Sequence, residues 1–133
     1  AGKKITLLGF AFKPDTGDTR DSPAIPLSRK LLSEHAQVRV HDPRAREEIE
    51  HDLASMEGDI AFIEDPYEAA FGAHAVALVT QWQQYRDLDY GRILKNMMRP
   101  AYLFDGRNHL DHQYLFNLGY NVFPLGSAPL THL

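Results

Sequence analysis

Cysteine is absent from the 133 residues of the chain, which excludes disulfides, thiolate metal sites and a cysteine nucleophile within it. No apolar run comes close to the roughly 18 residues that a membrane-spanning helix requires, and nothing at the N-terminus is typical of a signal or transit peptide. Basic residues form no cluster and the net charge is −4, which argues against a nucleic-acid interface but allows a local positive pocket for a phosphate. We therefore expect a soluble, cytoplasmic domain that binds neither nucleic acid nor membrane.

Several motifs of nucleotide-binding and catalytic sites are also missing. The chain has no GxGxxG, no Walker A sequence and no nucleophile elbow built around a serine. Its seven histidines include His109 and His112, three residues apart, but no third ligand stands at a spacing typical of a metal site. We expect solvated or structural histidines and no metal.

The length fits one domain with a substantial core, which we place at residues 1–133. The opening sequence AGKKITLLG enters an apolar stretch almost at once. This abrupt start suggests one domain of a longer protein.

Six short apolar stretches alternate with polar or amphipathic segments, and several of them are continuously apolar, as in strands covered on both faces of a parallel sheet. Helical spacing predicts helices over 24–32, 90–98 and 113–118, and Ser22 and Asp65 are expected helix caps. The alternation predicts an α/β, Rossmann-like, open doubly wound sheet, mainly parallel, with five to six strands and helices on both faces. The six stretches are 5–9, 38–42, 59–64, 75–80, 101–106 and 120–125.

In an open α/β sheet the ligand lies beyond the carboxyl ends of the strands, near the point where the strand order reverses. This rule selects the loop after Gly9, the turn 41–43, the segment 80–82 and the turn 105–108. Residues 9–23, GFAFKPDTGDTRDSP, stand where a Gly-rich phosphate turn is usual. They are rich in charged side chains instead, which indicates a binding loop of another kind.

Two cations and an aromatic residue of this loop are candidates for binding. Lys13 could contact a phosphate or a sugar hydroxyl while Phe12 covers a base or ribose; alternatively, both side chains pack along the loop. Arg20 could bind a phosphate with both arms of its guanidinium, or it could pair with a neighbouring aspartate of the same loop. Position alone does not choose between these interpretations.

The turn Asp105-Gly106-Arg107-Asn108 is the second candidate. Gly106 would let the backbone approach a ligand, and Arg107 would project into the same crevice as Lys13, where two cations suit a diphosphate. The alternative is an Asp-Gly turn with a solvated arginine. Trp82 has helical spacing to Tyr85, which favours a place in the core over stacking on a base.

Four segments together resemble the C-terminal, UDP-binding domain of the UDP-glucose/GDP-mannose dehydrogenase family, in family order and over nearly the whole chain. The extended TGDTRDS and DGRN sequences are most similar to the UDP-glucose 6-dehydrogenase branch, whereas the UDP-N-acetylmannosamine and GDP-mannose branches share the general loop. The segments are GFAFKPDTGDTRDSPA at 9–24, VRVHDP at 38–43, ALVTQWQQYRDLD at 77–89 and LFDGRNHLD at 103–111.

The resemblance implies an NAD-dependent oxidation of UDP-glucose to UDP-glucuronate, through a covalent thiohemiacetal on a cysteine. Phe12, Lys13 and Arg107 match residues that contact the UDP-sugar, and Arg20 matches an arginine that reaches NAD on an N-terminal domain. The catalytic cysteine and its neighbours have no counterpart here. The resemblance therefore implies a UDP-glucose-binding half-site, inactive alone, whose partner is the rest of a parent dehydrogenase that forms a homo-oligomer.

Two alternatives stay open. A related dehydrogenase could act on UDP-N-acetylmannosamine or GDP-mannose with nearly the same fold and phosphate contacts. A non-enzymatic receiver module would share the doubly wound architecture, but it would need an acidic pair after the first strand, where Gly9, Phe10 and Ala11 stand.

Overall fold

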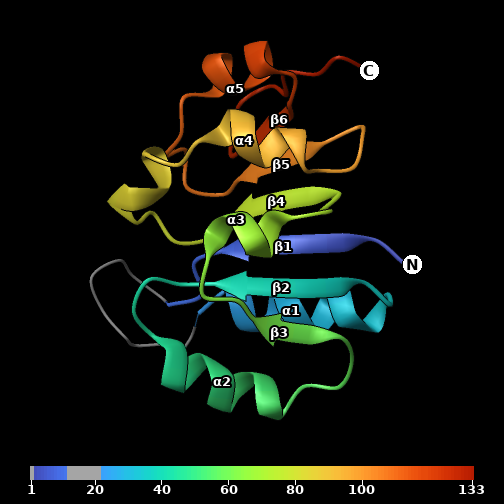
Figure 1. Cartoon of the computed structure of the whole chain (residues 1–133), viewed down its shortest axis with the longest axis vertical. Coiled ribbons are helices and arrows are strands. Elements are labelled where there is room, and N and C mark those ends of the chain that lie inside the picture. Colours follow the sequence, from blue (N-terminus) through green and yellow to red (C-terminus); the bar gives the residue numbers. More distant parts are fainter. Residues whose placement is uncertain (1, 12–21) are drawn as a thin grey trace.

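The computed structural model describes residues 2–11 and 22–133. Its strands form one parallel sheet of six strands in the order β3-β2-β1-β4-β5-β6 (Figure 1). All six predicted strands are confirmed, and the order is the one typical of Rossmann-like sheets. Their bounds are β1 Lys4–Leu8, β2 Gln37–His41, β3 Ile60–Phe62, β4 Ala75–Leu78, β5 Tyr102–Asp105 and β6 Asn121–Pro124.

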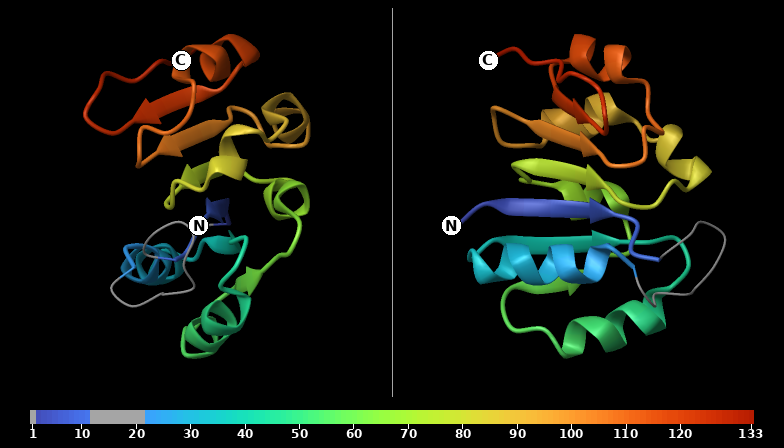
Figure 2. Two further views of the ribbon diagram at one scale, coloured as in Figure 1. Left: turned by 90° about the vertical axis from the view of Figure 1, so that its left-hand side faces the viewer. Right: turned by 180° about the vertical axis from the view of Figure 1, so that it is seen from behind.

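Helices connect the strands and cover both faces of the sheet, as predicted. The helices α1 and α2 lie on one face beside β1, β2 and β3, whereas α3, α4 and α5 lie on the other (Figure 2). Their bounds are α1 Ala24–Ser33, α2 Arg46–Ala54, α3 Pro66–Ala70, α4 Tyr90–Lys95 and α5 His112–Leu118, with a short 3-10 helix η1 at Gln83–Arg86. The helix expected over 90–98 ends at Lys95, and α2 is an addition to the predicted elements.

The two faces of the sheet carry separate cores, because successive side chains of a strand point to opposite faces. On β1, Leu7 packs with residues of α1 and α2, including Leu32 and Ile49. Its neighbour Leu8 packs in the core formed with α4 and α5. Both leucines are fully buried, which places β1 at the centre of the molecule.

Aspartates cap three of the helices. The side chain of Asp65 accepts a hydrogen bond from the Tyr67 amide at the start of α3, as expected, and Asp89 and Asp111 cap α4 and α5 in the same way. At the start of α1 the capping position falls on Pro23, one residue later than the expected cap Ser22, although Ser22 Oγ accepts a hydrogen bond from the Ala24 amide at 3.1 Å.

Candidate functional site

The carboxyl ends of β1, β2, β4 and β5 meet at one edge of the sheet, because all strands are parallel. The strand order reverses between β1 and β4, so the crevice expected for a ligand lies where these two strands end. The loops selected from the sequence after Gly9, His41, Val79 and Asp105 all belong to this edge. The residue types there decide what it can bind.

Asp42 holds the beginning of the loop after β1. Its Oδ2 atom accepts hydrogen bonds from the amides of Phe10 and Ala11 at 2.9 and 3.0 Å, and its Oδ1 atom accepts from the amides of Arg44 and Ala45 at 3.0 and 3.2 Å. The residue is 3% exposed, and its buried carboxylate is satisfied by these four backbone donors. Asp42 therefore holds the residues that follow β1 against those that follow β2.

Two hydroxyl groups hold the same loop from other sides. Thr80 Oγ1 donates to the carbonyl of Ala11 at 2.7 Å, and Ser22 Oγ donates to the carbonyl of Phe10. Phe10 lies before residues 12–21 and Ser22 directly after them. The bond between Ser22 and Phe10 therefore joins the two described ends of the loop. The predicted site residues Phe12, Lys13 and Arg20 lie outside the described residues.

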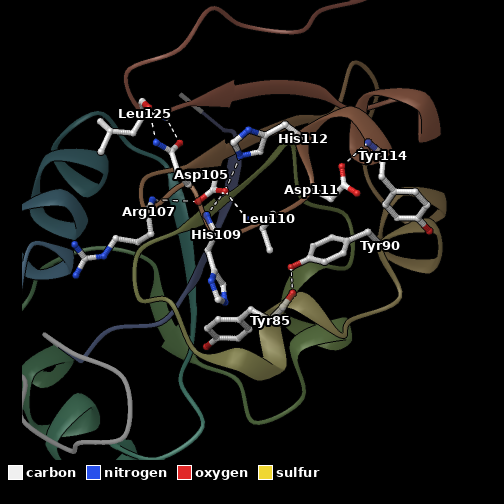
Figure 3. Close-up of polar contacts among 11 residues, drawn as sticks. Tyr85, Tyr90, Asp105, Arg107, His109, Leu110, Asp111, His112, Tyr114 and Leu125 are labelled. Atoms are coloured by element: carbon white, nitrogen blue, oxygen red, sulfur yellow. Dashed lines mark hydrogen bonds and ion pairs between the residues drawn. The ribbon is translucent and has the colours of Figure 1, made fainter.

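Asp105 organises the turn after β5. Its Oδ1 atom accepts from the Arg107 amide at 3.1 Å, and its Oδ2 atom accepts from the amides of His109 and Leu110 and from His112 Nε2, at 2.8 to 2.9 Å (Figure 3). The side chain is fully buried. The turn predicted at Asp105-Gly106 is therefore built around a buried carboxylate that fixes the backbone of Arg107.

Asn108 extends this arrangement to the end of β6. Its side-chain amide donates to the carbonyl of Leu125 at 2.7 Å and accepts from the Leu125 amide at 3.0 Å, while its own backbone has a positive φ of 51°. Asparagine is among the residues that tolerate this conformation. His109 also contacts Trp82, with 2.9 Å between its Nε2 atom and the carbonyl oxygen. Both histidines that follow Arg107 thus have structural contacts.

Arg107 lines a cavity of about 370 Å³ at the crevice. In Figure 3 its side chain extends away from Asp105, toward α1. The cavity is mainly apolar, and an apolar wall with one guanidinium suits the base, sugar and phosphate of a nucleotide. Its lining residues are Pro23 and Leu27 of the α1 region, Ala77, Leu78 and Val79 at the end of β4, and Phe104, Gly106 and Arg107 at the end of β5.

Behind the edge, aromatic residues form a buried polar chain. The Tyr85 hydroxyl lies 2.9 Å from His41 Nδ1, Tyr90 donates to the carbonyl of Tyr85, and Tyr120 donates to that of Tyr90 at 2.7 Å. Burial raises the pKa of all three tyrosines, so they remain protonated donors, and burial lowers the pKa of His41. Trp82 is 7% exposed and packs in the core, as its spacing favoured.

The roles of Asp42, Thr80 and Asp105 were not predicted residue by residue. A sequence signal existed: each stands at the end of a strand or within two residues after it, where Asp and Thr commonly bond to nearby backbone. Within residues 2–11 and 22–133, no three acidic or histidine side chains are grouped to hold a metal. No helix in the same part of the chain is long and apolar enough to cross a membrane.

The strand order, the crevice at its reversal point and the anchored loops define a Rossmann-like nucleotide-binding domain. Residues 6–112 match the model of the UDP-glucose/GDP-mannose dehydrogenase family, UDP binding domain. The chain belongs to this family, as its sequence segments indicated.

Relatives with established names agree with the family. The chain is 45% identical over 135 residues to UDP-glucose 6-dehydrogenase of Bos taurus, a match that covers 93% of the chain and 27% of the relative. It is 43% identical over 150 residues to UDP-glucose 6-dehydrogenase 2 of Oryza sativa subsp. japonica, covering 99% and 31%. The chain therefore spans about three tenths of the length of these relatives.

Solved structures support the same assignment. A UDP-glucose dehydrogenase from Pyrobaculum islandicum is 33% identical with a TM-score of 0.64, over 83% of this chain and 24% of that one. An NDP-N-acetyl-D-galactosaminuronic acid dehydrogenase from Methanosarcina mazei Go1 aligns with a TM-score of 0.78 over 94% of this chain and 25% of that one. At 24% identity the second structure bears on the fold alone.

Proposed function

We propose that residues 1–133 form the UDP-glucose-binding domain of a UDP-glucose 6-dehydrogenase, which oxidises UDP-glucose to UDP-glucuronate and reduces two NAD. The observation that carries the proposal is the cavity beside Arg107, at the carboxyl ends of β4 and β5, in a domain whose family is described as UDP binding. The named relatives support the choice of UDP-glucose. The domain alone would bind substrate without oxidising it.

In this proposal both sides of the crevice bind the UDP-sugar. Arg107, with its backbone fixed by Asp105, would bind the diphosphate or sugar, and Phe12 and Lys13 would contact the same UDP-sugar from the loop after β1. Asp42 and Thr80 would hold the start of that loop in place. The binding residues thus depend on buried polar groups that make no contact with the ligand.

NAD would supply the hydride acceptor when bound, mainly on the part of the parent chain outside these residues. The residues present here do not fit a dinucleotide site of their own, because the turn after β1 lacks the GxGxxG sequence and Gly9 packs against Thr80. Only Arg20 is proposed to reach the cofactor, and no step of the oxidation is assigned to this chain. A cytoplasmic location and a homo-oligomeric parent stay predictions.

Titration of the chain with UDP, followed by two-dimensional NMR of the backbone amides, tests the proposal. We expect shifts at Gly106 and Arg107 and at the amides of Phe10 and Ala11, which border the crevice. Arg107→Ala should weaken UDP binding by roughly tenfold or more, since a charge-assisted contact to phosphate contributes about 1.5 to 3 kcal/mol. Lys13→Ala should weaken it as well.

Arg29→Ala is the matched control, because Arg29 lies on α1 beside another cavity at the opposite edge of the sheet. Its UDP affinity should equal that of the unchanged chain. A spectrum without shifts at millimolar UDP would reject a preformed half-site. In the parent enzyme, unchanged kinetics for both Arg107→Ala and Lys13→Ala would reject the roles given to these residues.

A further inference from the structure

A short segment between β4 and α4, residues 80–85, is bonded to both sides of the crevice. On one side, Thr80 Oγ1 donates to the carbonyl of Ala11 at the start of the loop after β1, at 2.7 Å. On the other side, the carbonyl oxygen of Trp82 lies 2.9 Å from Nε2 of His109, in the turn after β5. Because a carbonyl oxygen only accepts, the imidazole donates in this contact. The segment therefore connects the two parts of the chain that carry the proposed ligand contacts.

Tyr85, at the end of this segment, adds contacts to the end of β2. Its hydroxyl donates to the carbonyl of His41 at 3.2 Å and lies 2.9 Å from Nδ1 of the same residue. The amide of Gly9 donates to that carbonyl at 2.7 Å, and Asp42, the next residue, accepts from the two amides that follow Gly9. Through His41, Tyr85 is thus joined to the base of the loop after β1.

One carbonyl group joins the two sides. The carbonyl oxygen of Trp82 accepts from the backbone amide of Tyr85 at 3.1 Å as well as from His109 Nε2. In Figure 3 the ring of His109 extends from the turn after β5 toward Tyr85. Trp82 is 7% exposed and Tyr85 is fully buried, so these bonds lie in an interior where hydrogen bonds are stronger than in water. A shift of Tyr85 therefore moves the acceptor of His109, and with it the turn that contains Arg107.

We propose that Tyr85 and His109 are positioning residues for the nucleotide sugar: through residues 80–85 they hold the loop after β1 and the turn after β5 at the separation that the ligand requires. This inference rests on the proposed function, which gives both sides of the crevice a contact with the UDP-sugar. Tyr85 and His109 are not among the described residues that line the cavity beside Arg107, so they act on binding through the backbone. A ligand held from two sides is bound more tightly when both sides are already in place, because less ordering is needed.

Amide hydrogen exchange without ligand tests the connection itself. Tyr85→Phe removes the hydroxyl that bonds to His41, and His109→Ala removes the donor to Trp82. We expect each substitution to accelerate exchange on the opposite side of the crevice: at Leu110 in Tyr85→Phe, and at Phe10 in His109→Ala. Both accelerations should exceed that at amides of β2 by roughly threefold or more, because local opening changes exchange only where the structure loosens.

The affinity for UDP tests the effect on binding, in the two single variants and in the double variant. Each single substitution should weaken binding roughly fivefold, the ratio that corresponds to one net hydrogen bond. Residues that act independently would together weaken it roughly 25-fold, whereas residues that act through one segment should weaken it little more than one substitution alone. His109→Gln should restore the affinity, because the glutamine amide can donate to the same carbonyl.

Tyr120→Phe is the matched control, because Tyr120 is as fully buried as Tyr85 and its hydroxyl donates to the carbonyl of Tyr90 in α4, at 2.7 Å. It should lower stability in urea and leave the affinity for UDP unchanged. Equal weakening of UDP binding in Tyr120→Phe and Tyr85→Phe would overturn the proposal, since the loss would then follow from general destabilisation. Multiplication of the two single losses in the double variant would overturn it as well. If the unchanged chain bound no UDP while exchange on both sides responded as expected, the proposed function would be rejected and the connection between the two sides would stand.

Discussion

The Nε2 atom of His112 lies 2.8 Å from Oδ2 of Asp105, so the first residue of α5 is joined to the last residue of β5. The same oxygen also accepts from the amides of His109 and Leu110. The turn between β5 and α5 is thereby closed around one buried carboxylate. Arg107 is a residue of this turn. The position of the proposed ligand-binding arginine is thus a property of the whole turn.

Asp105→Asn should destabilise the domain by about 2 to 3 kcal/mol, because an asparagine amide cannot accept at both of its ends and buried donors are left unsatisfied. Urea unfolding of both proteins measures the difference. UDP affinity should fall as well, since the Arg107 amide loses its fixed partner. Asp89→Asn is the control: Asp89 is an exposed cap of α4, and asparagine caps a helix equally well, so its stability should be nearly unchanged. Equal stabilities of the two variants would contradict the role of Asp105.

Asp42→Asn should loosen the base of the loop after β1 without loosening the turn after β5. Amide hydrogen exchange distinguishes the two, because Phe10 and Ala11 donate to Asp42 whereas His109 and Leu110 donate to Asp105. We expect exchange at Phe10 and Ala11 to become roughly tenfold faster or more in Asp42→Asn, in line with the loss of about 1.4 kcal/mol of local stability. The pattern should reverse in Asp105→Asn. Uniform acceleration in both variants would mean that the two carboxylates act only on global stability.

The sequence predicted the strands and the site edge because both follow from apolar runs and from the order of elements. The helix α2 was harder to predict, since Ile49 and Leu53 are its only buried residues and its remaining side chains are mostly charged. The anchoring roles of Asp42 and Asp105 escaped individual prediction because, apart from His112, the partners described above are backbone amides, which no side-chain pattern reveals. The exposure of Phe104 on β5, which is 43%, was likewise hidden, because continuous apolar strands favour coverage on both faces.

Gly9→Ala should be one of the most damaging small substitutions in the chain. Gly9 has a φ of 93°, and an added Cβ would lie 2.5 Å from Thr80 Cβ and 2.8 Å from the Thr80 backbone nitrogen. The positive φ should lower the free energy of unfolding by about 1 kcal/mol, and overpacking should lower it by about 1 to 3 kcal/mol. The two losses should add. Gly72→Ala separates the two effects, because Gly72 has a φ of 71° but nothing within 4 Å of an added Cβ. Thermal or urea unfolding should show a clearly larger loss for Gly9→Ala, and similar losses would contradict the close packing of β1 against Thr80.

His41 should make the stability of the domain depend on pH. The residue is 3% exposed, and burial lowers its pKa in the folded chain despite the opposing influence of Asp42. Above about pH 6.5 the histidine is neutral in both states, and as the pH falls below this value the unfolded chain takes up the proton first. The folded state therefore loses stability relative to the unfolded state as the solution is acidified.

The substitution His41→Gln isolates this contribution from that of the other histidines. Glutamine can still bond to the Tyr85 hydroxyl, which lies 2.9 Å from His41 Nδ1, but it cannot take up a proton. We expect the free energy of unfolding to fall between about pH 7.5 and 5.5 by a larger amount in the unchanged chain than in His41→Gln, because only the former carries a buried neutral imidazole. Urea unfolding at both pH values gives the two differences. Identical pH dependence in the two proteins would show that His41 has the same proton affinity folded and unfolded, and the low pKa assigned to its buried position would be wrong.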